Sequence, residues 1–212
     1  MVAAKVALHA LVAAPLAWLC WQAGEIASGA DIDALGADPV KAIEHRLGLW
    51  ALRLLLLTLA VSPLRQVLGM PRLLRFRRML GLWAFAYACL HFSAWLALDL
   101  RGWWSLVPGE IAKRPYITVG FAAWLLLVPL AVTSTRGWMR RLGRNWGRLH
   151  RLVYASAALA ALHFWWVVKS DFREPLLYVV LLAVLLGWRL LRRRGAGASG
   201  RHAPASARTE QK

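Results

Sequence analysis

The sequence contains very little cysteine. Cys20 and Cys89 are its two cysteines, and each lies inside an apolar run with no second cysteine nearby. A disulfide framework or a zinc site needs a cluster of such residues, and covalent attachment of a c-type haem needs a C-x-x-C-H motif, which the sequence lacks. The sequence therefore supports none of these three features.

Acidic residues are also scarce, with 10 Asp and Glu against 27 Lys and Arg and a formal net charge of +17. Such a charge can indicate nucleic-acid binding. Here, however, the basic residues fall in short stretches between apolar runs, 59% of all residues are hydrophobic and 13 are tryptophan. The mean hydropathy is +0.48. We therefore expect a protein that lies in a lipid bilayer and binds no nucleic acid.

Long apolar segments dominate the chain. A membrane-spanning helix needs about 20 apolar residues, with a range of about 17–25. Six segments are of about this length, at residues 6–21, 47–61, 79–98, 116–135, 152–168 and 176–191. We predict an all-α integral membrane protein, with a six-helix transmembrane bundle as one domain over residues 1–194 and a disordered, basic cytoplasmic tail over residues 195–212.

The first segment has an alternative interpretation as a cleavable signal peptide, since Lys5 precedes it and small residues follow it. Its end carries Trp18, Trp21 and Gln22, which are typical of a helix anchored at the membrane interface. We therefore favour an uncleaved helix.

The charges of the connecting segments predict the orientation. Residues 62–78 and 136–151 contain five and six arginines and no acid, and the tail is strongly basic. The acids other than Glu210 lie in the other connecting segments, at residues 25–44, 99–110 and 171–174. Because basic segments face the cytoplasm, we expect six crossings with both termini cytoplasmic.

Two histidines, His91 and His163, lie deep in apolar segments, where an ionisable side chain is a candidate functional residue. They are thirteen and twelve residues beyond the arginines that precede their helices, and both helices are expected to run from the inside to the outside. At 1.5 Å per residue each lies about 20 Å from the cytoplasmic end. Two neutral imidazoles at one depth suit the axial positions of a haem b iron. The alternative is that each is hydrogen-bonded within the bundle.

Two further residues are candidates with open alternatives. His150 precedes His163 by thirteen residues and lies among arginines at the cytoplasmic edge, where it could ligate a second haem, lie near a flavin or quinone, or be solvated. Arg53, inside the segment at 47–61, is expected at about 10 Å depth. Its guanidinium could neutralise a haem propionate or extend to the outer interface.

Five strings carry a resemblance to a known family: RMLGLWAFAYACLH at 78–91, KRPYITVG at 113–120, TSTRGW at 133–138, RLHRLVY at 148–154 and VKSDFREP at 168–175. Together they are similar to the MsrQ (YedZ) family of haem-binding membrane subunits, within the ferric-reductase-like transmembrane domain superfamily. The resemblance covers nearly all of residues 5–194.

The resemblance implies a multi-pass cytochrome b of the bacterial inner membrane. Its electrons would come from the quinone pool or a cytosolic flavin reductase. Its acceptor would be a periplasmic molybdopterin methionine sulfoxide reductase, which repairs oxidised envelope proteins. The chain would then be an electron-transfer subunit, with catalysis on methionine sulfoxide in the partner.

The resemblance also places the family's haem-associated histidines at His91, His150 and His163. It implies one haem b, or two if His150 also binds iron. Family members are described as flavoproteins that bind FMN, but these residues contain no flavin motif. The wider superfamily places two histidines on each of two helices and appends FAD and NADPH domains. Here the segment at 79–98 has one histidine, and no glycine-rich dinucleotide fingerprint follows residue 191.

Two other functions stay open at this stage. One is a ferric-reductase or quinol-oxidising cytochrome b with a different acceptor. The other, from a different class, is a cofactor-free transporter or scaffold whose histidines relay protons.

Overall fold

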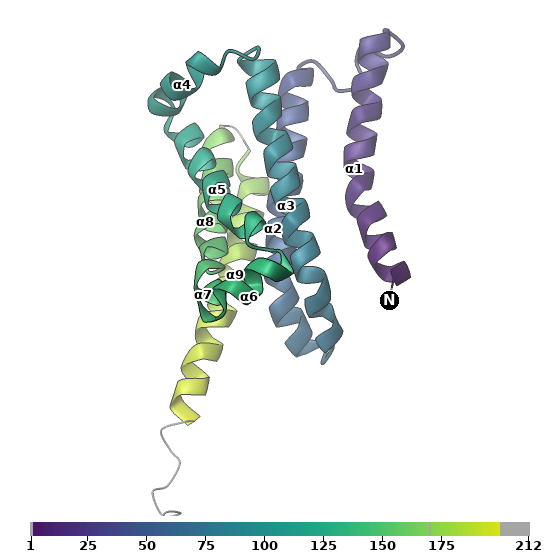
Figure 1. Cartoon of the computed structure of the whole chain (residues 1–212). Helices are drawn as coiled ribbons and strands as arrows, with labels where there is room; N and C mark the ends of the chain where they lie inside the picture. The colour runs from purple at the N-terminus through teal and green to yellow at the C-terminus, as the bar shows by residue number, and fades with distance from the viewer. Residues whose placement is uncertain (1, 170, 200–212) are drawn as a thin grey trace, which may run out of the picture.

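The computed structural model describes residues 2–169 and 171–199, and the regular structure within them is helical (Figure 1). The all-α prediction is therefore confirmed over the described residues. The long helices are α1 (Val2–Ser28), α2 (Pro39–Val67), α3 (Leu74–Ala94), α5 (Pro115–Val132), α8 (Leu152–Val167) and α9 (Arg173–Ser199). Short helical turns join them: η1 (Pro71–Leu73), η2 (Trp95–Asp99), η3 (Trp104–Leu106), α4 (Val107–Lys113), α6 (Arg136–Leu142) and α7 (Arg144–Leu149).

Local sequence explains where several helices begin and end. The carboxylate of Asp38 accepts a hydrogen bond from the Lys41 main-chain N–H at 3.1 Å, and Pro39 follows it in the first turn, so α2 has both a capping residue and a proline suited to that position. Gly143 separates α6 from α7 with a φ of +47°, a conformation that side chains disfavour. The chain can therefore reverse its helix direction at this point.

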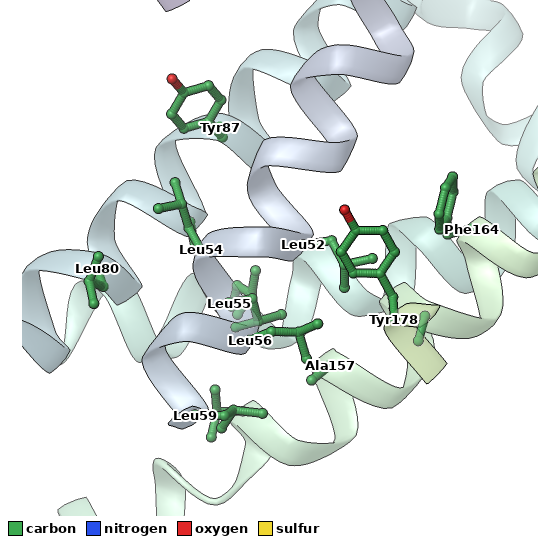
Figure 2. Packing of buried hydrophobic residues seen from close by; sticks show 14 of the residues in the cluster. Leu52, Leu54, Leu55, Leu56, Leu59, Leu80, Tyr87, Ala157, Phe164 and Tyr178 are labelled. Carbon is green, nitrogen blue, oxygen red and sulfur yellow. The ribbon is translucent and has the colours of Figure 1, made fainter. Parts of the chain in front are cut away.

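The long helices pack as two antiparallel pairs. Helix α2 lies along α3, and α5 lies along α8, while α9 covers α8 and α2 (Figure 1). The core is formed largely by leucines of α2 and small residues of α8, and Figure 2 shows Leu56 and Leu59 beside Ala157. The hydroxyl of Ser156 donates to the main-chain oxygen of Ala123 at 2.9 Å, which ties α8 to α5.

Helix α1 stands apart from this bundle in Figure 1 and is attached through a few apolar residues, among them the buried Val12 and Leu19, and through polar side chains. The Tyr87 hydroxyl donates to the main-chain oxygen of Val12 at 2.7 Å, and the Trp83 indole N–H donates to Nδ1 of His9 at 2.8 Å. The guanidinium of Arg46 also donates to the side-chain oxygen of Gln22. A space is left between α1 and the α2–α3 pair.

The two ends of the bundle differ in charge. One end, called the acidic end, holds the first residues of α2, α5 and α9 and the acids other than Glu210. The opposite end, called the basic end, holds the arginines of residues 62–78 and 136–151. The acidic and basic segments that alternate along the sequence therefore lie at opposite ends of the folded bundle.

Five helical stretches are long and apolar enough to cross a membrane within the described residues: Val2–Ser28, Pro39–Val67, Pro71–Asp99, Pro115–Val132 and Arg173–Arg192. Each corresponds to a predicted span. Many of their large apolar side chains are exposed, among them Leu11, Leu57, Leu125 and Val184, as expected of surfaces that face lipid. The protein is therefore a multi-pass membrane protein.

The remaining predicted span, at 152–168, corresponds to α8. With 16 residues, α8 is shorter than the roughly 17–25 residues that a crossing needs. The number of crossings and the side of the termini stay predictions. Several helices extend past the predicted spans, because a helix can continue beyond its apolar core into polar residues. Helix α9 likewise continues to Ser199, past the predicted start of the tail at 195, and residues 200–212 lie outside the described residues.

Candidate functional site

His91 and His163 come together near the acidic end of the bundle. His91 lies in the last turn of α3, His163 lies close to the end of α8, and both are partly buried. Their ring centroids are 6.2 Å apart, and the ring planes meet at 69°. The two histidines that the sequence places at one depth therefore lie side by side, on different helices, in the structure.

Each imidazole is held by a main-chain carbonyl of the neighbouring helix. Nδ1 of His91 lies 2.8 Å from the oxygen of Glu44 in α2, and Nδ1 of His163 lies 2.7 Å from the oxygen of Tyr116 in α5. Because a carbonyl only accepts hydrogen bonds, each Nδ1 carries a proton and donates it. The lone pair of the neutral imidazole is then on Nε2, which is the nitrogen left to bind a metal.

Each ring also lies against a glycine of that neighbouring helix. A Cβ at Gly120 would lie 2.7 Å from Nδ1 of His163, and a Cβ at Gly48 would lie 3.2 Å from Nδ1 of His91. The two rings are therefore seated where the adjacent helix has no side chain.

These contacts repeat at a constant spacing of 72 residues. Glu44 corresponds to Tyr116, Gly48 to Gly120 and His91 to His163, and the pattern A-x-A-x-L-H-F occurs at 86–92 and again at 158–164. The α2–α3 and α5–α8 pairs are thus two copies of one arrangement, each supplying one imidazole. The glycines and the carbonyls were not predicted from the sequence, although the internal repeat indicates them.

The arrangement suits an iron held by a macrocycle. Within the described residues, no group of three or more His, Cys, Asp or Glu side chains could hold a bare metal ion. The pair offers two nitrogens, which match the axial ligands of a bis-histidine haem. If an Nε2 atom of each ring bound one metal ion at about 2 Å, the ring centroids would lie roughly 6 Å apart. The observed separation of 6.2 Å fits this requirement.

His150 lies at the basic end, away from this pair. It follows α7, its Nε2 is 3.2 Å from the hydroxyl of Thr133, and its ring stacks on Trp146 with 4.0 Å between centroids. Burial, and after it the positive charge of Arg77, lower the pKa of His150 below its ordinary value, so the imidazole is neutral at pH 7. The residue 72 positions earlier is Arg78, so the repeat offers His150 no partner imidazole.

Arg53 contacts α9 in the structure. Its Nε donates to the hydroxyl of Tyr178 at 2.8 Å, and its guanidinium lies 3.6 Å from a carboxylate oxygen of Glu174 and 5.2 Å from the ring centroid of Trp50. Glu174 also lies 3.8 Å from Nε2 of His45. The predicted contact of Arg53 with a haem propionate stays a prediction.

A cavity of about 510 Å³ lies between α1 and the α2–α3 pair. Its lining includes Trp18, Arg46, Trp50, Arg53 and Tyr87. The rings of Trp50 and Tyr87 are 6.4 Å apart, and Tyr87 precedes the first of the paired histidines by one helical turn. The cavity is therefore adjacent to the helix that carries that histidine.

Comparison with known proteins identifies the family of the chain. Residues 47–161 match the family described as ferric reductase like transmembrane component. The chain is 63% identical to the protein-methionine-sulfoxide reductase heme-binding subunit MsrQ of Xanthomonas euvesicatoria pv. vesicatoria (strain 85-10), over 92% of this chain and 89% of that protein. It is 65% identical to the protein of the same name from Xanthomonas campestris pv. campestris (strain 8004), over the same shares of the two chains.

A more distant relative of the same name, from Caulobacter vibrioides, is 48% identical over 84% of this chain and 81% of that protein. No solved structure matches the chain. The matched range begins in α2 and ends in α8, so it contains the first of the paired histidines and both glycines, and it ends two residues before the second histidine. Since identity of this level extends over nearly the whole of each protein, the chain belongs to the MsrQ family of ferric-reductase-like membrane proteins.

Proposed function

We propose that the chain is an electron-transfer subunit, a membrane cytochrome b that carries haem b between His91 and His163. The observation that carries the proposal is the pair of imidazoles 6.2 Å apart, each with its Nδ1 on a main-chain carbonyl. The names of the relatives, which describe heme-binding subunits, support the same ligand. A bound haem would supply reversible one-electron chemistry at its iron.

The protein's own part is to orient two Nε2 atoms and to exclude water from the space between them. His91 is carried by the α2–α3 pair and His163 by the α5–α8 pair, so the two ligands come from different helix pairs that share one core. Each ring is fixed by a hydrogen bond to a helix other than its own. Metal-binding histidines held in this way keep one tautomer and one orientation.

The proposal includes the orientation in the membrane. Six crossings with both termini cytoplasmic put the basic end of the bundle at the cytoplasm of a bacterial inner membrane, as the positive-inside rule requires. The acidic end, with His91 and His163 near it, then faces the periplasm. This orientation supports delivery of electrons to a periplasmic acceptor.

The acceptor is proposed to be a periplasmic molybdopterin methionine sulfoxide reductase, and the chemistry on methionine sulfoxide takes place there. Reduction of a sulfoxide to methionine and water consumes two electrons and two protons, so this subunit would deliver two electrons in sequence. The donor is the quinone pool or a cytosolic flavin reductase, and FMN is a further expected cofactor. The 510 Å³ cavity beside α1 is within the usual size of small-molecule sites, about 300–1,000 Å³.

His150 is kept as a candidate ligand of a second haem. Its neutral state favours metal binding, but Nε2 would have to leave Thr133 and a second ligand would have to come from elsewhere. The ratio of haem to protein distinguishes the two cases, with one haem expected if only the histidine pair binds iron and two if His150 also does.

The function is tested by spectroscopy and electron transfer on the full chain. Detergent-purified protein from haem-replete expression is expected to show sharp b-type bands in its reduced-minus-oxidised spectrum, and a featureless spectrum would exclude the cytochrome. In proteoliposomes, the reduced protein should be fully reoxidised by a catalytic amount of the periplasmic reductase together with methionine sulfoxide, and not by methionine sulfoxide alone.

The description of the matched family as ferric reductase like favours a second candidate, a ferric-reducing cytochrome b. The same proteoliposomes separate the two functions. Rapid reoxidation by a ferric chelate, with none by the reductase and methionine sulfoxide, would replace the first proposal by the second.

Replacement of Arg53 by alanine is expected to lower haem affinity without changing topology. A charge-assisted hydrogen bond contributes about 1.5–3 kcal/mol, which corresponds to a loss of roughly tenfold or more if the guanidinium neutralises a propionate. Haem titration into the apo-protein measures the effect. The control is Tyr178→Phe, which removes the hydrogen bond from Arg53 to α9 and keeps the positive charge. Equal haem affinity in Arg53→Ala and the wild type would show that Arg53 serves only its contacts with α9 or the membrane interface.

A further inference from the structure

We infer that Gly48 and Gly120 are positioning residues, which let the two imidazoles reach the carbonyls that hold them. The inference rests on the proposed function, because it treats these imidazoles as iron ligands. Each glycine follows its carbonyl residue by four positions: Gly48 follows Glu44, and Gly120 follows Tyr116. The two sets are related by the 72-residue repeat, so one arrangement is found twice in the chain.

Helix geometry explains why the fourth residue matters. Residues four apart lie on the same face of an α-helix, and each Cα–Cβ bond leans toward the helix N-terminus. A side chain at the position of Gly48 or Gly120 would therefore lean over the carbonyl one turn earlier. The carbonyl already accepts the helical hydrogen bond, and its second lone pair receives the imidazole N–H only if the approach is open.

The distances show how little space is left. A methyl group at Gly120 would lie 2.7 Å from Nδ1 and 2.8 Å from Cε1 of His163. At Gly48 it would lie 3.1 Å from Cε1 and 3.2 Å from Nδ1 of His91. Non-bonded carbon atoms pack at about 3.5–4.0 Å, so the first ring would be displaced from its hydrogen bond and the second would move by a few tenths of an ångström.

Such close contacts of an added methyl group are not found at other helical glycines of the bundle. A methyl group at Gly24, Gly147 or Gly187 would meet nothing within 4 Å. Replacing a helical glycine by alanine favours the helix by about 1 kcal/mol, and this gain is common to all these positions. Gly187, inside α9, is therefore a matched control for the effect of the added methyl group on the imidazoles.

The structural consequence is tested on the apo-protein. The full chain is expressed under haem limitation with ¹⁵N-labelled histidine, and the tautomers of His91 and His163 are read by NMR, with assignment by single replacement. In the wild type and Gly187→Ala, both rings are expected to carry their proton on Nδ1. In Gly120→Ala, the His163 signal is expected to lose this pattern, while Gly48→Ala should change the His91 signal less.

Haem titration into the same four proteins gives the second readout. Loss of a hydrogen bond that orients a metal ligand lowers metal affinity about 10–100-fold. We expect a decrease of this size for Gly120→Ala, a smaller decrease for Gly48→Ala and none for Gly187→Ala. The inference is overturned if both glycine variants keep the wild-type tautomers and bind haem as Gly187→Ala does.

Thermal unfolding identifies a variant that fails to assemble. If Gly120→Ala does not fold, Gly48→Ala decides the question: a changed His91 tautomer supports the inference and an unchanged one overturns it. A wild type that binds no haem would remove the proposed function, whereas the tautomer measurement would still decide the role of the glycines.

Discussion

Replacing either His91 or His163 by alanine is expected to abolish the low-spin b-type signal of the purified protein. A low-spin haem with two imidazole ligands needs one nitrogen from each ring. In the structure the two ring centroids are 6.2 Å apart. Either variant should therefore lose the same low-spin signal, because one of the two nitrogens that would hold the haem iron is missing. Reduced-minus-oxidised spectra and the haem-to-protein ratio measure the loss.

The matched control is His9→Ala. His9 lies in α1, where its Nδ1 accepts a hydrogen bond from the Trp83 indole N–H, and it is in a different part of the molecule from the histidine pair. This variant should keep its haem and its bands. Full haem with unchanged bands in either His91→Ala or His163→Ala would show that the pair does not ligate iron, and the proposed site would have to be abandoned.

Replacing Ala157 by leucine is expected to destabilise the bundle. Ala157 has no exposed surface and lies in α8 beside leucines of α2 (Figure 2). Extra methylene groups in a packed core cost about 1–3 kcal/mol, which for a chain of this size lowers the melting temperature by roughly 2–4 °C for each kcal/mol. Because α8 also carries His163, displacement of the helix should reduce haem content as well.

The control for Ala157→Leu is Ala158→Leu, the same substitution one residue later, where the side chain is exposed. It should leave the melting temperature of the detergent-solubilised protein within about 2 °C of the wild type, since surface replacements change stability by about 0.5 kcal/mol or less. Equal melting temperatures for the two variants would show that α8 does not pack against α2 in the way described.

The hydropathy of the sequence predicted the helices well. Lipid offers no hydrogen-bond partner to the main chain, so an apolar run of this length is compelled to form a helix. The predicted span at 152–168 agrees with α8 (Leu152–Val167) to within one residue, whereas α2 and α9 extend well beyond the apolar runs at 47–61 and 176–191.

For the two histidines, the sequence predicted a shared depth but not their contacts. Counting residues from the flanking arginines placed His91 and His163 at one depth, since the rise per residue is constant in an α-helix. It could not show that the rings meet, because this depends on the rotation of α3 and α8 about their axes. It also could not show which carbonyls receive Nδ1, because Glu44 and Tyr116 are on neighbouring helices, 47 residues before each histidine.

Composition, hydropathy and charge by themselves determined that this is a helical membrane protein with separated acidic and basic segments and with two histidines at matched depth. Helix formation follows from the lipid environment, and the matched depth follows from the constant rise of an α-helix. Both can be deduced from the order of the residues. Only the tertiary structure decided that Gly48 and Gly120 lie under the imidazoles, that Arg53 contacts α9 and that His150 stacks on Trp146 away from the pair. Those contacts depend on how helices distant in the sequence pack and rotate against one another.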